Sequence, residues 1–158
     1  MTSFVPDTNV MIASVQAWHV HHERARSELR TRRENGDALL LAAHSLVECY
    51  SVLTRLPPSQ RVRPEIAVRM IGANFVERGR IIGLGAGDYW PILEAAAGRG
   101  VAGGRVFDAL IAAAARAAGA EVLLTFNVRH LWGLRKAWRS WSREPHKLPK
   151  RHVLQSFL

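Results

Sequence analysis

The sequence predicts a three-layer α/β/α domain, in which helices cover both faces of a central parallel sheet of four to five strands. Two observations predict it: short apolar segments alternate along the chain with longer helical patterns, and these segments are continuous rather than interrupted by polar residues. Continuous apolar strands are buried on both faces, which is typical of a parallel sheet. The chain has 158 residues, of which 48% are hydrophobic, so we expect one core and one domain.

Each element follows from a local pattern of apolar spacing and helix boundaries. The expected strands are residues 3–6, 37–44, 80–84 and 121–126. The expected helices are residues 8–15, 21–35, 45–56, 64–79, 86–100 and 104–119. Pro57 and Pro58 stop the third helix, while Pro64 opens the fourth and Gly79 closes it. Pro91 must lie in the first turn of its helix or kink it.

The positive charge of the chain is concentrated near its end. Residues 129–158 hold eight Lys and Arg against one Glu, a net charge of +7 out of +9 for the whole chain. A basic segment on a nearly neutral body favours a polyanionic partner such as nucleic acid. The sequence has neither a signal peptide pattern nor an apolar run of membrane-spanning length, so we expect a cytoplasmic protein without a membrane partner. The single cysteine, Cys49, excludes an internal disulfide and a cysteine cluster for zinc.

Acidic and polar residues stand where a parallel sheet places its binding site, outside the carboxyl ends of the strands. Asp7 follows the first strand, and Glu48 lies about one turn into the helix after the second. Asp108 is near the start of the helix before the fourth strand, and Asn127 lies just beyond that strand. We expect these four side chains to share one cavity.

Each acid also has a purely structural explanation, because acidic residues are favoured at the start of a helix. Asp7 can cap the helix that follows it, Ser45 and Glu48 have the spacing of a capping box, and Asp108 can complement a helix dipole. Three acids in one cavity, however, repel one another and require a positive charge. Mg²⁺ or Mn²⁺ meets this requirement, because it binds a few carboxylates and keeps several waters. Such an ion activates water and polarises a phosphoryl oxygen, which indicates phosphodiester hydrolysis.

Three segments, VPDTNVMI, SLVECYSVLTRLPP and GGRVFDALIAAAARAAGAEVLLTFNVRHL, resemble in order and spacing the PIN-domain ribonucleases. They are most similar to the VapC-type toxins of bacterial toxin–antitoxin pairs. The resemblance implies a PIN domain core over residues 1–131. The basic, Trp-rich segment over residues 132–158 departs from the family's usual ending, and we expect it to pack on the same domain. It also implies a homodimer that cleaves RNA and is held in check by an antitoxin, whose peptide lies in an apolar groove near the early helices.

The resemblance also assigns roles to individual residues. The residues that match the family's binding site for Mg²⁺ or Mn²⁺ are Asp7, Glu48 and Asp108. Asn9 and Thr125 match supporting polar positions, and Asn127 would orient the attacking water. The family often has a further acid where His130 stands, so a second metal site should be weak. We favour a surface or packing role for His130.

Basic side chains are the candidates for contacts with RNA. They are Arg105, Arg129, Arg135 and Lys136. Trp132, Trp138 and Trp141 interleave with cations and could stack on single-stranded RNA, but we favour packing on the body or on a partner. The sequence leaves open whether Val153 and Leu154 form a last strand.

Three interpretations remain to be weighed. The segment WHVHH, residues 18–22, suggests a metal cluster but is better explained by surface histidines at a helix entrance. A nucleic-acid-binding module that has lost catalysis would keep the basic tail without cutting RNA. A metal-dependent phosphatase acting on small phosphate esters would typically have a second aspartate where Asn9 stands.

Overall fold

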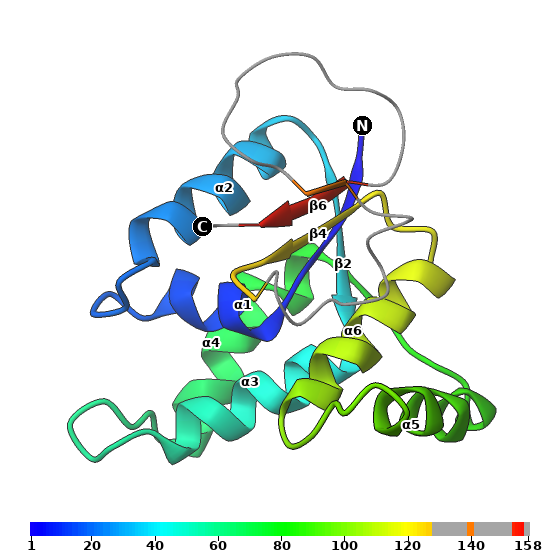
Figure 1. The fold of residues 1–158 in the computed structure, drawn as a ribbon. Coiled ribbons are helices and arrows are strands. Elements are labelled where there is room, and N and C mark those ends of the chain that lie inside the picture. The colour runs from blue at the N-terminus through cyan, green and yellow to red at the C-terminus, as the bar shows by residue number, and fades with distance from the viewer. Residues whose placement is uncertain (128–138, 141–152, 157–158) are drawn as a thin grey trace.

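The computed structural model describes residues 1–127, 139–140 and 153–156, which form an α/β/α arrangement (Figure 1). One parallel sheet has the strand order β3-β2-β1-β4-β6-β5. Its strands are β1 (Ser3–Pro6), β2 (Ala38–Ala42), β3 (Arg80–Ile82), β4 (Val122–Thr125), β5 (Arg139–Ser140) and β6 (Val153–Ser156). The predicted parallel sheet is confirmed, and β1 lies near its middle.

The predicted helices are all present, with differences at their ends. They are α1 (Thr8–Val15), α2 (His22–Glu34), α3 (Ala43–Arg55), α4 (Pro64–Asn74), α5 (Tyr89–Ala97) and α6 (Arg105–Ala117). The fourth predicted helix ends at Asn74 and is followed by the 3-10 turn η1 (Val76–Arg78), while η2 (Ala86–Asp88) precedes α5. Pro91 therefore lies in the first turn of its helix. None of the helices in the described ranges is long and apolar enough to span a membrane.

The start of α3 differs from the prediction, and this difference overturns the capping-box explanation of Glu48. Strand β2 runs directly into the helix, so Ala42 is the N-cap and offers no side-chain hydrogen bond. Ser45 lies inside the first turn instead of capping it, and its hydroxyl is buried without a hydrogen-bond partner in the described part of the chain. The position of the Glu48 side chain must therefore have another cause.

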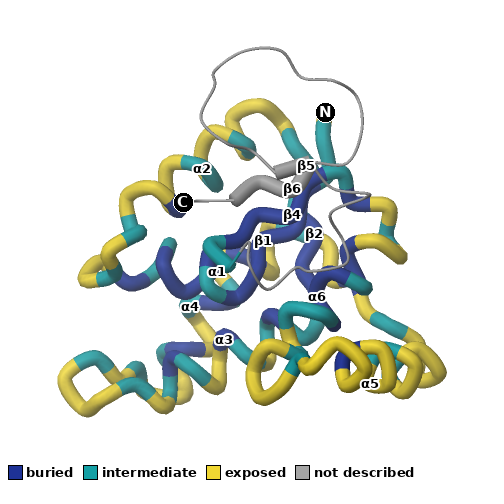
Figure 2. The backbone as a smooth tube through the Cα atoms, viewed as in Figure 1, coloured by how far each residue is buried: buried dark blue, intermediate teal, exposed yellow. Residues whose placement is uncertain are grey.

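Buried side chains on the two faces of the sheet form separate cores. Figure 2 shows that buried residues are concentrated in the central strands and in the helix segments beside them. On one face, Val5 and Leu123 pack against Ile111 of α6. The other face is covered by α1, α2, α3 and α4. Its buried members include Phe4, Val10, Met11, Leu41, Cys49, Leu53, Ile71, Phe75 and Leu124. Because helices cover both faces, the central strands β1, β2 and β4 are largely apolar, and polar groups gather where these strands end.

The last strand, which the sequence left open, is present. Val153 and Leu154 lie in β6, which pairs in parallel with β4. Ser156 aligns with Thr125 at the carboxyl end of this pair. The sheet thus extends beyond residues 1–131 and includes part of the basic segment.

Candidate active site

The sheet places the ends of β1 and β4 side by side. Pro6 aligns with Leu124, and the backbone N–H of Asp7 donates to the carbonyl of Leu124 at 2.8 Å. Asp7 is the N-cap of α1, as predicted, because its Oδ1 accepts from the N–H of Thr8 at 2.6 Å. One carboxylate oxygen is therefore used to begin the helix, and the other remains for different partners.

The second oxygen of Asp7 is held by the two predicted supporting residues. Oδ2 accepts from the hydroxyl of Thr125 at 2.7 Å and from the side-chain amide of Asn9 at 2.8 Å. Asn9 Oδ1 accepts from the N–H of Phe126 at 3.2 Å, and the N–H of Asn127 donates to Thr125 Oγ1 at 2.9 Å. The predicted Asp7, Asn9, Thr125 and Asn127 are thus brought together around a carboxylate that is only 3% exposed.

Glu48 reaches this site from α3 through a residue that the sequence analysis missed. The hydroxyl of Thr8 donates to Glu48 Oε2 at 2.6 Å, while the backbone of Thr8 donates to Asp7. Thr8 is buried and therefore links two of the predicted acids. The sequence signal that could have identified Thr8 is its position directly after the capping Asp7, in the segment DTN.

Asp108 lies in the first turn of α6, and the pKa values of Asp7 and Asp108 reflect repulsion among the three acids. The pKa of Asp7 is raised to about 7, mainly by burial. The charges of Asp108 and Glu48 contribute to this rise, whereas the hydrogen bonds from Thr125 and Thr8 lower the pKa. Burial and the charge of Glu48 raise the pKa of Asp108 to about 6, while Arg105 lowers it. Each of the three acids therefore interacts electrostatically with the other two, as a shared site requires.

The acids do not form a complete ligand cage. Within residues 1–127, no three His, Cys, Asp or Glu side chains form a group that could hold a metal ion by themselves. The oxygens of Asp7 and Glu48 accept hydrogen bonds from hydroxyl and amide groups instead. Mg²⁺ commonly binds through one or two carboxylates and keeps several waters. Hard oxygen ligands that repel one another fit such a water-rich site.

The structure describes one of the basic residues that the sequence singled out. Arg105 is exposed one turn before Asp108, and its guanidinium donates to the carbonyl of Gly100 at 3.2 Å. The other candidates lie outside the described residues, as do His130 and the tryptophans of the tail. These are Arg129, His130, Trp132, Arg135, Lys136, Trp138 and Trp141.

The family model of the PIN domain matches residues 4–131. The chain belongs to the PIN domain family. Ribonuclease VapC40 of Mycobacterium tuberculosis H37Rv is 40% identical over 124 residues, which cover 78% of this PIN-domain chain and 86% of that protein. Ribonuclease VapC27 of the same strain is 33% identical over 115 residues, or 73% and 71% of the two chains. The family predicted from the three sequence segments is confirmed.

Solved structures share the same fold. VapC20 of Mycobacterium tuberculosis, a sarcin-ricin loop cleaving toxin, has a TM-score of 0.60 at 18% identity and covers 76% of this PIN-domain chain and 86% of its own. VapBC2 from Rickettsia felis, bound to a DNA fragment from its promoter, has a TM-score of 0.59 at 21% identity and coverages of 81% and 90%. FitAcB from Neisseria gonorrhoeae has a TM-score of 0.56 at 18% identity and coverages of 82% and 91%.

The metal-free protein should become less stable as the pH rises. The pKa values of Asp7 and Asp108 lie above the ordinary value of 3.8, so the folded state binds more protons than the unfolded chain between about pH 4 and pH 7. Denaturant titrations in chelator should show the free energy of unfolding falling by about 3 kcal/mol from about pH 5 to about pH 8. Asp108→Asn should flatten this curve, and an equally steep curve in that variant would contradict the assignment.

Proposed function

We propose that this chain is a metal-dependent endoribonuclease toxin, which cleaves RNA phosphodiester bonds with Mg²⁺ or Mn²⁺ and is neutralised by an antitoxin. The observation that carries the proposal is the buried Asp7 carboxylate at the end of β1, which is linked to Glu48 through Thr8 and repelled by the charges of Glu48 and Asp108. The relatives named ribonuclease VapC40 and VapC27 support the activity. The likeness to VapBC2 and FitAcB supports an antitoxin partner.

In this mechanism Asp7, Glu48 and Asp108 would hold the metal ion together with water, and the ion would supply an acidified water and positive charge at the phosphate. Thr125 and Asn9 fix the direction of Asp7 Oδ2 by two hydrogen bonds. Thr8 fixes Glu48 in the same way. Because the pKa of Asp7 is about 7 in the metal-free protein, its proton must leave when the ion binds. Asn127, whose backbone N–H donates to Thr125 Oγ1, would orient the attacking water.

Asp7→Asn should lower RNA cleavage by more than about 100-fold, because removal of a metal ligand lowers activity more than removal of a residue that only positions a ligand. The purified chain is incubated with a pool of cellular RNA in Mg²⁺, Mn²⁺ or chelator, and the new RNA ends are sequenced. Asp88→Asn is a matched control, since Asp88 is exposed in η2 and should leave cleavage unchanged.

Each outcome of this experiment separates the proposal from its rivals. Full activity of Asp7→Asn would contradict the assigned site. Salt-sensitive RNA binding by the wild type without metal-dependent cutting would favour an inactive binding module. Turnover of small phosphate esters but not of RNA would favour a phosphatase.

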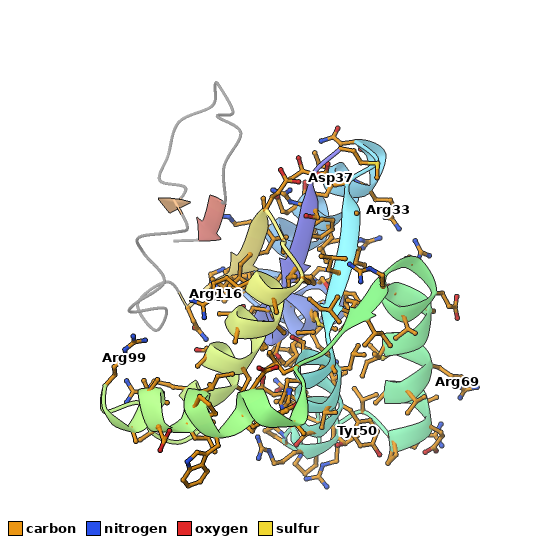
Figure 3. All side chains as sticks on the ribbon, turned by 90° about the vertical axis from the view of Figure 1, so that its right-hand side faces the viewer. Arg33, Asp37, Tyr50, Arg69, Arg99 and Arg116 are labelled. Atoms are coloured by element: carbon orange, nitrogen blue, oxygen red, sulfur yellow. The ribbon has the colours of Figure 1, made fainter. Side chains whose placement is uncertain are left out.

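A cavity of about 480 Å³ between α1, α2 and α4 fits the antitoxin part of the proposal. Its apolar lining includes Phe4, Val15, Leu29, Leu39, Met70 and Phe75. Arg26, Arg30 and Arg33 of α2 also line it. Figure 3 shows Arg33 near the start of β2, at the opposite end of the molecule from Tyr50 of α3. We infer that the antitoxin inserts an apolar peptide with acidic residues here, away from the candidate active site.

Charge reversal at the cavity should therefore release the enzyme from inhibition. Arg30→Glu combined with Arg33→Glu should weaken antitoxin binding by about tenfold or more, since like charges at an interface are unfavourable. Inhibition of RNA cleavage by increasing antitoxin measures the effect, and cleavage without antitoxin should not change. Arg69→Glu is the control, because Arg69 is exposed on α4 and does not line the cavity. Unchanged inhibition of the double variant would contradict this placement.

A second face fits the proposed homodimer. Exposed apolar side chains of α3, α5 and α6 are Val47, Tyr50, Trp90, Leu93 and Phe107. The starts of these helices meet around His44, whose ring centroid lies 5.3 Å from that of Tyr89 and 6.5 Å from that of Phe107. Exposed apolar side chains on neighbouring helices are typical of a protein interface.

Leu93→Glu should shift the protein from dimer to monomer, because it places a charge in this apolar face. Light scattering of the isolated chain over a range of concentrations measures the shift. Val68→Glu, at an exposed valine on α4, should leave the dimer intact. A wild-type chain that stays monomeric at high concentration would contradict the homodimer.

A further inference from the structure

A cluster of flat rings lies at the edge of the candidate active site. The loop between α1 and α2, at the left of Figure 1, supplies Trp18, His19 and His21, and Phe126 directly follows β4. The rings of His21 and Phe126 are stacked, with centroids 4.3 Å apart and 20° between their planes. His19 stacks on Phe126 at 6.5 Å and lies 5.7 Å from Trp18. We call these four side chains the ring ladder.

Phe126 connects the ring ladder to the candidate active site. Its backbone N–H donates to Asn9 Oδ1 at 3.2 Å, and Asn9 Nδ2 donates to Asp7 Oδ2 at 2.8 Å. Thr125, the preceding residue, donates to the same oxygen. The ring ladder therefore begins two hydrogen bonds away from the most buried of the three acids.

The ladder becomes more exposed with distance from the core. Phe126 packs partly against the core that covers β4, His19 and His21 are half-buried, and Trp18 is 47% exposed. Hydrogen bonds hold the outer rings: Trp18 Nε1 donates to Gln16 Oε1 at 3.0 Å, and His19 Nδ1 accepts from the N–H of His21 at 3.1 Å. Rings that are fixed in advance lose little conformational entropy when a ligand stacks on them.

The chemistry of the ladder suits a neutral flat ligand. Burial, with the neighbouring His21 and His22, lowers the pKa of His19, which favours an uncharged imidazole. The histidines also form no metal-binding group among the residues that the structure describes. Unpaired bases in RNA are commonly recognised by stacking on aromatic and histidine side chains.

We propose that the ring ladder binds an unpaired base of the RNA, next to the phosphate that is cleaved, by stacking on Trp18, His19 and His21. This inference rests on the proposed ribonuclease function and adds to it a binding site for one unpaired base. Every base has a flat face that can stack. The ladder therefore contributes affinity and placement of the RNA rather than selection of one base.

Binding measured in chelator tests this inference without requiring cleavage. The probe is a fluorescently labelled single-stranded RNA of mixed sequence and about 12 nucleotides, within the site size of single-strand-binding proteins. Fluorescence anisotropy should show that Trp18→Ala and His21→Ala each weaken binding by about 5- to 50-fold. His21→Phe should bind within about twofold of the wild type, because a flat ring remains. Val20→Ala is the control, since Val20 is 87% exposed in the same loop.

A duplex of the same sequence supplies a second readout, because its bases are already stacked on one another. Trp18→Ala and His21→Ala should bind this duplex as the wild type does, whereas a purely structural effect would weaken both RNAs alike. Equal loss for both RNAs, unchanged binding of the single strand by the variants, or absence of single-strand binding by the wild type would overturn the inference. If the expected binding pattern appears but the wild type cuts no RNA in Mg²⁺ or Mn²⁺, the ring ladder stands and the ribonuclease proposal fails.

Discussion

The fold holds the Asp7 carboxylate at 3% exposure within reach of two other negative charges, and the rest of the site depends on this arrangement. Three donors, on Thr8, Asn9 and Thr125, fix the carboxylate in place but do not neutralise it. Burial and repulsion together raise its pKa to about 7. A cation shared by the acids would offset both the burial of charge and the repulsion. The arrangement that destabilises the metal-free fold is therefore the one that a metal-dependent nuclease requires.

Much of this site was predictable because it depends on where strands end. The apolar runs located β1 and β4, and residues that follow neighbouring parallel strands lie near one another, which brought out Asp7 and Asn127. Thr125 was identified through the resemblance to the PIN-domain family. The capping-box explanation of Glu48 was wrong because β2 passes into α3 at Ala42 with no proline, glycine or capping side chain to mark the boundary. Thr8 was missed because its hydroxyl bonds to a helix 40 residues away, and no local pattern encodes such a contact.

The ring ladder was also not predictable, because no local sequence pattern encodes its long-range contact. Sequence supplied the residue types of the α1–α2 loop, and surface histidines were the reasonable interpretation. The decisive contact, between His21 and Phe126, joins two segments more than a hundred residues apart and follows only from the docking of that loop on the end of β4. Three faces of the molecule then serve the three proposed tasks. In this proposal the strand ends would cut RNA, the arginine-lined cavity would receive the antitoxin, and the exposed apolar side chains of α3, α5 and α6 would form the dimer.

Calorimetric titration of Mn²⁺ into the metal-free chain, repeated in buffers with different ionisation enthalpies, tests most directly whether the acids share a cation. Such a series counts the protons released when the ion binds. With the pKa of Asp7 at about 7 and that of Asp108 at about 6, binding at about pH 6 should release roughly one proton or more. Binding at about pH 9 should release almost none. A titration without heat of binding, or one in which no proton leaves at either pH, would contradict the account.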